Sequence, residues 1–264
     1  MEAVMRKENT VHPTAIVSDQ ARLGSGVIVG PFSIIEAGAQ IGDRCEIGSH
    51  VRITGSVRMG VGNRIFQGAV LGSPPQDLKF RGEDSLLVIG DGNVIREYAT
   101  LNPATGAGEA TRVGSGCLLM AYSHIAHNCE IGDQVILANS VNLAGHVLIE
   151  DFAIIGGLTP VHQFVRIGAH SFIGGGSRVP QDVPPYLRGA GNPMVMSGIN
   201  AVGLQRRGFS EATLRSLRFA YRLLYRQQLN TTQALERIET ELGDDPCIQR
   251  LVAFVRQSVR GITK

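Results

Sequence analysis

The 264-residue sequence contains no tryptophan, and aromatic residues make up only 5% of it. This composition argues against a broad core filled by large rings and favours a solenoid with a thin aliphatic core. No apolar run reaches the roughly 18 residues of a membrane-spanning helix, so no transmembrane segment is expected. The first residues, MEAVMRKENT, lack the apolar segment of a signal peptide, and we therefore expect a protein that is not secreted.

Cysteine is also scarce: four are present, and no two are spaced as CxxC. Three of them, Cys45, Cys117 and Cys129, share one position of the repeat described below, which predicts small core residues rather than disulfides or metal ligands. A reducing cytoplasm fits this usage best. Cys129 lies two residues after His127, so a Cys–His nucleophile pair is an alternative, although the core position of the cysteine argues against it.

A strong excess of one charge is missing as well, since the formal net charge is only +2. The charges are nevertheless unevenly distributed. Residues 186–264 hold twelve Lys and Arg against six Asp and Glu, whereas the residues before them hold thirteen against seventeen. The basic C-terminal part either meets an acidic partner or keeps a helical surface soluble, and we expect no nucleic-acid partner.

The sequence is rich in branched aliphatic residues that recur every six positions. A helix or a flat sheet has a period near 3.6 or 2, so neither generates this spacing. A hexapeptide repeat does, and each hexad then forms one short strand and one corner of a parallel β-helix. Both breaks in the ladder are whole multiples of six, so one register is kept. The ladder consists of Val11, Val17, Leu23, Val29, Ile35, Ile41, Ile47, Ile53, Met59, Ile65, Leu71, Ile89, Ile95, Leu101, Val113, Leu119, Ile125, Ile131, Leu137, Leu143, Ile149, Ile155, Val161, Ile167, Ile173 and Val179.

Two other positions of the hexad support this fold. The residue after the aliphatic is often glycine, as at Gly24, Gly42 and Gly132, which we expect where the backbone turns a corner or takes a positive φ. The fifth position, counted from the aliphatic, is usually small, as at Ala39 and Cys45. Three hexads would form a triangular coil, and stacked coils would give a prism on the order of 40 Å long.

The ladder ends at Val179, and residues 183–193 predict a linker because Pro and Gly interrupt regular structure there. Helices are predicted over residues 200–207, from an N-cap at Ser210 to about Gln228, from Thr231 or Thr232, and from Asp245 onward. We therefore predict an all-β solenoid followed by α-structure, with a β-helix domain over residues 1–190 and a small helical domain over residues 191–264.

Two insertions, at residues 72–87 and 102–112, interrupt the predicted coils. A solenoid accommodates insertions at its corners, where they project outward. Such projections often carry the binding surface of a repeat protein. A passive surface loop is the alternative for both.

Four of the seven histidines are close together: His124, His127, His146 and His162. Because residues 18 apart stack on successive coils, His127, Gly145 and Gln163 form one column, and the four imidazoles lie on one flank. Acid–base chemistry needs only one imidazole that titrates near neutral pH. A zinc site is the alternative, since γ-class carbonic anhydrases share this fold, but the His-x-x-His spacing and the lack of a carboxylate ligand within the cluster disfavour it. We expect no metal.

Seven motifs together resemble one family, the UDP-N-acetylglucosamine 3-O-acyltransferases that begin lipid A biosynthesis in Gram-negative bacteria. The resemblance covers essentially the whole chain. The motifs are QDLK (76–79), HIAHNC (124–129), LAGHV (143–147), AIIGG (153–157), VHQF (161–164), QDVPPY (181–186) and GLQRRGFS (203–210).

This resemblance implies a cytoplasmic enzyme and a left-handed β-helix, in a homotrimer with active sites between subunits. The implied reaction transfers a (3R)-hydroxyacyl group from acyl carrier protein to the 3-position of the glucosamine of UDP-N-acetylglucosamine. No cofactor is expected, because the acyl donor is carried on the phosphopantetheine of the carrier protein.

The family pattern also implies residue roles. His127 would be the general base that removes the proton of the sugar hydroxyl. Asp77 would orient it, and the backbone N–H of Gly145 would bind the tetrahedral oxyanion. Gly175, with Phe172 nearby, matches the position that limits acyl-chain length, and a glycine there implies room for a long chain. The implied substrate-binding residues are Gln76, Lys79, His124, His146, His162, Gln163, Asn200, Arg206 and Arg207.

Two departures from the family pattern stand out. Members have His-Arg-Gly-Thr where this chain has NPAT at residues 102–105, which leaves open the donor and sugar contacts and whether the acceptor is a 3-hydroxyl or a 3-amine. They have an acidic residue where this chain has Val202, which weakens the assignment of one nucleotide contact, although Asn200 matches.

Three other functions are alternatives. A glucosamine N-acyltransferase of the same pathway has an extra N-terminal domain, whereas the repeat here begins at Val11. An enzyme related to γ-carbonic anhydrase would contain zinc. A non-catalytic trimeric scaffold would use the histidines only to line a subunit interface.

Overall fold

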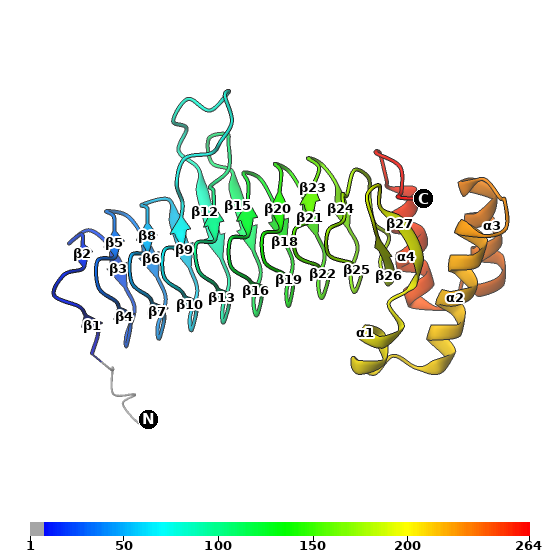
Figure 1. Cartoon of the computed structure of the whole chain (residues 1–264), viewed down its shortest axis with the longest axis horizontal. Coiled ribbons are helices and arrows are strands. Elements are labelled where there is room, and N and C mark those ends of the chain that lie inside the picture. Colours follow the sequence, from blue (N-terminus) through cyan, green and yellow to red (C-terminus); the bar gives the residue numbers. More distant parts are fainter. Residues whose placement is uncertain (1–7) are drawn as a thin grey trace.

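The computed structural model describes residues 8–264, so residues 1–7 of the predicted first domain lie outside the described part. Residues 8–264 form a three-sided parallel β-helix with four helices at its C-terminal end (Figure 1). This confirms the predicted solenoid and helical part. Within residues 8–264, no helix is long and apolar enough to cross a membrane.

Each coil contributes one short strand to each of three sheets. The first sheet consists of β1 (Thr10–Val11), β4 (Ile28–Val29), β7 (Glu46–Ile47), β10 (Arg64–Ile65), β13 (Val94–Ile95), β16 (Leu118–Leu119), β19 (Ile136–Leu137), β22 (Ile154–Ile155), β25 (Phe172–Ile173), β26 (Leu187–Ala190) and β27 (Val195–Ile199). The second consists of β2 (Ile16–Val17), β5 (Ile34–Ile35), β8 (Arg52–Ile53), β11 (Val70–Leu71), β14 (Thr100–Leu101), β17 (His124–Ile125), β20 (Asn142–Leu143) and β23 (Pro160–Val161). The third consists of β3 (Arg22–Leu23), β6 (Gln40–Ile41), β9 (Val57–Met59), β12 (Leu86–Ile89), β15 (Ala110–Val113), β18 (Glu130–Ile131), β21 (Leu148–Ile149) and β24 (Arg166–Ile167).

The aliphatic ladder forms the core of this prism. Val11 pairs with Val29 on the next coil, and the register survives a longer coil, since Ile65 pairs with Ile95. From Val29 onward the ladder side chains are buried, and Ile125 has no exposed surface, whereas Val11 on the first coil is 41% exposed. Each fully buried aliphatic side chain of this size stabilises the fold by roughly 1.5–3 kcal/mol.

The corners differ from the expectation for glycine. The positive φ falls three residues after the aliphatic and is often taken by a larger residue, as at Tyr122 (62°) and His146 (59°). Gly42, which directly follows the aliphatic Ile41, serves a different purpose. A Cβ on Gly42 would lie 2.5 Å from the carbonyl oxygen of Gly60, so the close stacking of coils requires glycine there.

Both insertions leave the β-helix at the edge between the second and third sheets, which we call the second–third edge. The first joins β11 to β12 and covers residues 72–85, and the second joins β14 to β15 and covers residues 102–109. Figure 1 shows the loops rising from one edge of the prism. The predicted ranges were too long at their C-terminal ends, because β12 and β15 already pair with each other from Leu86 and Ala110.

The predicted linker at residues 183–193 is wrong for Leu187–Ala190. This segment forms β26, which extends the first sheet beside β25 and pairs antiparallel with β27. A strand is favoured there because the last coil would otherwise leave the backbone donors and acceptors of β25 unpaired.

Four helices follow, at the positions that the sequence predicts: α1 (Ala201–Arg206), α2 (Glu211–Tyr225), α3 (Thr231–Leu242) and α4 (Pro246–Arg256). Each begins after a polar N-cap whose side chain accepts a backbone N–H of the first turn. The caps are Asn200, Ser210, Asn230 and Asp245.

Candidate active site

The centre of the candidate site is His127, at the second–third edge just after β17. The buried side chain of Ile125 anchors this coil, and the imidazole that follows is only 15% exposed. The ring lies against the next coil, where a Cβ on Gly145 would come within 2.5 Å of His127 Cε1. The predicted column of His127 and Gly145 is therefore confirmed, and glycine is required at position 145 because any side chain there would displace the imidazole.

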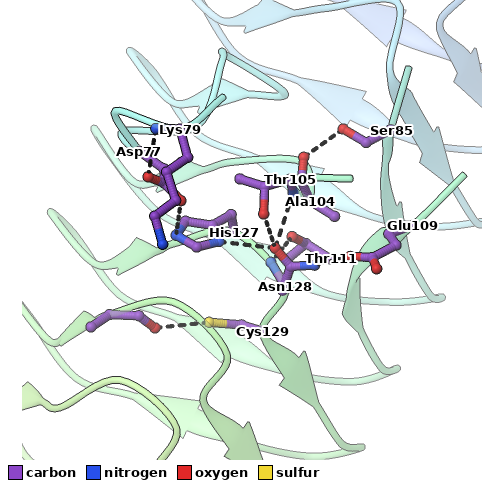
Figure 2. A network of polar contacts seen from close by, with 11 residues as sticks. Asp77, Lys79, Ser85, Ala104, Thr105, Glu109, Thr111, His127, Asn128 and Cys129 are labelled. Atoms are coloured by element: carbon purple, nitrogen blue, oxygen red, sulfur yellow. Dashed lines mark hydrogen bonds and ion pairs between the residues drawn. The ribbon is translucent and has the colours of Figure 1, made fainter. Parts of the chain in front are cut away.

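The first insertion brings a carboxylate to the same ring. Oδ2 of Asp77 lies 3.9 Å from Nε2 of His127, and Figure 2 shows the two side chains facing each other. Asp77 is held in turn by Lys79, whose backbone N–H donates to Oδ1 at 2.9 Å. Asp77 and Lys79 both lie in the first insertion, which the sequence predicts to project from the coils. A negative charge 3.9 Å from Nε2 stabilises the protonated imidazole of His127.

The other ring nitrogen of His127 meets Asn128, which the sequence reasoning did not single out. Nδ1 lies 2.9 Å from Oδ1 of Asn128. The same oxygen accepts the backbone N–H of Thr105 at 3.0 Å and its hydroxyl at 2.9 Å. The amide nitrogen of Asn128 donates to Glu109. Figure 2 shows this network reaching from the second insertion to the imidazole.

These contacts fix the tautomer of His127. A backbone N–H only donates and an ionised carboxylate only accepts, so Thr105 and Glu109 together determine which end of the Asn128 amide is oxygen. The oxygen faces Nδ1 of His127, which must therefore carry the proton of the neutral ring. Nε2 keeps its lone pair, on the side that faces Asp77.

The neighbouring histidines are neutral partners. His124 accepts or donates a 2.7 Å hydrogen bond with the hydroxyl of Thr100, and His146 packs edge-on against His127 with ring centroids 5.2 Å apart. Burial, and then the charge of His127, lower the pKa of both His124 and His146. At neutral pH they therefore offer hydrogen bonds rather than positive charge.

The remaining predicted residues of this flank are more exposed. His162 and Gln163 lie one coil beyond Gly145, after β23, and Nδ1 of His162 lies 3.0 Å from the backbone oxygen of Gln163. Gln76 is an exposed residue of the first insertion, directly before Asp77. The structure thus brings His124, His127, His146, Asp77 and Gly145 into direct contact or close proximity, with Gln76, Lys79, His162 and Gln163 at the rim.

The Cys–His alternative is wrong. Cys129 has no exposed surface, and its thiol donates to the carbonyl oxygen of Ala144 at 3.2 Å. Burial raises the pKa of this thiol to about 12, so it stays protonated. In the part of the chain that the structure describes, no three His, Cys, Asp or Glu side chains are grouped so that they could hold a metal ion.

Three of the predicted substrate-binding residues, Asn200, Arg206 and Arg207, lie apart from the others, in and beside α1. Asn200 and Arg206 line a cavity of about 840 Å³, where Val202 takes the place of the family's acidic residue. Arg207 lies outside it, with its guanidinium 4.9 Å from the ring of Phe152. Four more arginines line the cavity: Arg188, Arg215, Arg218 and Arg222. Figure 1 shows α1 on the opposite side of the prism from the projecting loops, so one chain does not bring this cluster to His127.

The residues matched to the acyl-chain limit also lie away from His127. Phe172 points outward from β25, is 37% exposed and lines the same cavity. Gly175 follows at the next corner, where a Cβ would lie 3.2 Å from the carbonyl oxygen of Gly157. A side chain at position 175 would thus need only a small shift of its neighbour.

Two family models match the sequence. One describes the second domain of UDP N-acetylglucosamine O-acyltransferases and matches residues 182–263. The other describes bacterial transferase hexapeptide repeats and matches residues 20–55 and 110–145.

Individual relatives match over most of the chain. An acyl-[acyl-carrier-protein]–UDP-N-acetylglucosamine O-acyltransferase of Gloeothece citriformis is 51% identical over 208 residues, which are 79% of this chain and 75% of the relative. The enzyme of that name from Verminephrobacter eiseniae is 46% identical over 263 residues, 97% of this chain and 100% of its own. A solved UDP-N-acetylglucosamine acyltransferase of Bacteroides fragilis is 42% identical, with a TM-score of 0.94 over 97% of this chain and 100% of the other.

Proposed function

The chain belongs to the acyl-[acyl-carrier-protein]–UDP-N-acetylglucosamine O-acyltransferases, and from this premise we propose that His127 is the general base of the transfer. The observation that carries the proposal is the arrangement of its two ring nitrogens. Nδ1 is held by Asn128, and Nε2 is left as a proton acceptor beside Asp77. Such a base typically contributes about 10²–10⁴-fold to the rate.

The proposed chemistry begins with the 3-hydroxyl of the glucosamine of UDP-N-acetylglucosamine. As its oxygen attacks the carbonyl carbon of a (3R)-hydroxyacyl thioester, Nε2 of His127 takes the hydroxyl proton. Asp77 stabilises the resulting imidazolium, and the tetrahedral oxyanion accepts the N–H of Gly145. That N–H has no acceptor in the described part of the chain, which supports this role. Collapse of the intermediate forms the ester and expels the phosphopantetheine thiolate of acyl carrier protein, which takes the proton back from His127.

We propose that the active sites lie between subunits of a homotrimer. This is supported by the distribution of the predicted substrate residues, because the His127 cluster and the Arg206 cluster lie on opposite sides of one prism. A second chain would supply Asn200 and Arg207 to the nucleotide and diphosphate of a substrate bound at His127, with Lys79 as a further cation. Arg206 would contact acyl carrier protein and its phosphopantetheine arm. The arginines of α2 would meet the acidic carrier protein.

A cytoplasmic location is part of this proposal. The acyl donor, acyl carrier protein, is a cytoplasmic protein, and all four cysteines are free thiols.

The acyl-chain limit is proposed at Gly175 with Phe172. The outward ring of Phe172 offers an apolar contact for an alkyl chain, and the missing side chain at position 175 leaves its far end open. Gly175→Met should shift the preferred donor to a shorter hydroxyacyl chain, measured in competition between carrier proteins of different acyl length. Unchanged selectivity would remove Gly175 from this role.

The central test is mass spectrometry of the UDP-sugar products formed from a mixture of hydroxyacyl carrier proteins, which reports the acceptor atom and chain length together. His127→Ala should lose about 10²–10⁴-fold in kcat, with the trimer intact by light scattering. His12→Ala is the control, since its side chain is exposed and, among the described residues, hydrogen-bonds only with Thr14. Transfer that persists in His127→Ala would exclude the general-base role.

A further inference from the structure

We infer that Glu109 is a positioning residue for His127 that acts through the side chain of Asn128. This inference rests on the proposed role of His127 as general base, and it concerns what keeps Nε2 free for that role. Glu109 never reaches the imidazole itself. It accepts a hydrogen bond from the Asn128 amide nitrogen, and the amide oxygen binds Nδ1 of His127.

The second insertion places Glu109 for this contact. Its last residues turn back before β15, with the backbone N–H of Glu109 donating to the carbonyl oxygen of Gly106. A Cβ on Gly106 would lie 2.9 Å from the carboxyl carbon of Glu109, so glycine at this point leaves the carboxylate its space. Asn128 is fixed from the other side, because its backbone N–H donates to the hydroxyl of Thr111.

The order of donors and acceptors from Glu109 through Asn128 to His127 determines how the imidazole is held. Three donors converge on the Asn128 oxygen, two from Thr105 and one from His127. An anionic acceptor on the amide nitrogen polarises the amide and strengthens its oxygen as an acceptor. A neutral amide therefore orients the ring, while the full negative charge of Glu109 stays one group away from it.

This polarity can be reversed by mutation. Asn128→Asp should keep the acceptor for Nδ1 but turn a carboxylate oxygen toward Glu109, and two like charges in hydrogen-bond contact disfavour each other. We expect kcat to fall by about tenfold or more. Adding Glu109→Gln supplies an amide donor to the new carboxylate, and the double variant should recover most of that loss.

A second readout separates positioning from a purely structural role. In the double variant a carboxylate contacts Nδ1 directly and stabilises the imidazolium, so the acid limb of the kcat/KM profile should move to higher pH. KM for the UDP-sugar should change less than kcat throughout, because neither residue is placed on the substrate. Glu130→Gln is the control for the loss of one negative charge, because Glu130 is an exposed acid on the next coil.

Different outcomes of these experiments contradict the positioning role of Glu109 and the proposed acyl transfer. If wild-type protein transfers acyl groups but the double variant is no more active than Asn128→Asp, Glu109 does not act through Asn128. An Asn128→Asp variant with wild-type kcat would overturn the inference as well. Absence of transfer by the wild-type protein would instead contradict the proposed function.

Discussion

His146 and His170 occupy the same position of their hexads, with φ angles of 59° and 57°, yet their surroundings share little. His146 lies at the second–third edge, beside His127 and the two insertions. His170 lies at the corner between the third and first sheets, which we call the third–first edge. There its ring is stacked between Phe152 and Tyr186, with centroids 4.8 and 5.8 Å away.

The two edges differ in hydrogen bonding more than in backbone. At the third–first edge, Nδ1 of His170 is buried and has no hydrogen-bond partner among residues 8–264, and burial lowers the pKa of this histidine to about 4. At the second–third edge, the insertions supply Asp77, Thr105 and Glu109 to the His127 network. The repeat therefore provides equivalent corners, and the insertions make one of them chemically different.

Of the substitutions that separate the two edges, the one with the largest expected effect fills the contact between coils at the second–third edge. Gly145→Ala places a methyl group against the His127 ring, which must leave the position where it contacts Asp77 and Asn128. We expect kcat to fall by about a hundredfold, as for a catalytic group displaced by about 1 Å. The melting temperature should change little, because the contacting atoms belong to a side chain and not to the backbone.

Gly42→Ala is the opposite case at the third–first edge. Its methyl group would meet the carbonyl oxygen of Gly60 on the next coil, so the coils must separate. The expected cost is about 1–3 kcal/mol of folding stability, with kcat per folded molecule retained. If both glycine variants lost activity and stability to the same degree, the two edges would not differ in function.

A smaller loss is expected when the first insertion keeps its shape but loses its charge. Asp77→Asn removes the carboxylate that lies 3.9 Å from Nε2 of His127. Since this pair is partly exposed, we expect kcat to fall on the order of tenfold. Asp84→Asn, an exposed residue of the same insertion, is the control in the same steady-state assay. Equal effects of the two substitutions would mean that loop charge in general, and not the Asp77 contact, supports the reaction.

The sequence predicts the repeated part of the molecule well, because a six-residue period reports directly on which side chains fill the core. The same period puts His127 above Gly145, since it fixes the length of a coil. It carries no information about Thr105 and Glu109, whose positions depend on how an insertion without periodicity folds back on the coil. Asn128 belongs to the HIAHNC motif, but only the structure shows that its side chain connects Thr105 and Glu109 to His127.

Gly42, a glycine that directly follows the aliphatic, does not take the positive φ that the hexad pattern suggested as one explanation for glycine at this position. Glycine is recurrent wherever two backbones approach each other or φ is positive, and sequence alone does not separate these causes. At Gly42 the cause is the neighbouring coil. The positive φ of the corners is instead taken by residues such as Tyr98 and Tyr122, whose rings stack on one another 5.4 Å apart.

The smallest predicted effect concerns the third–first edge and appears only in acid. Because the folded-state pKa of His170 is about 4, below the unfolded value near 6.5, the unfolded chain binds a proton first as the pH falls. Stability is therefore lost progressively between about pH 6.5 and pH 4. Burial is the main cause of the lowered pKa, followed by repulsion from Arg207 and Arg250 and partly opposed by Asp151.

His170→Phe keeps the ring stack and removes the titrating group. The fall in melting temperature between pH 7.5 and pH 5 should then be smaller than in wild type by roughly 2–4 °C, after allowance for the partial exposure of the ring. His124 and His146 contribute equally to both proteins, so the difference isolates His170. An identical acid loss in the variant would show that the stacked histidine is not what makes this edge sensitive to pH.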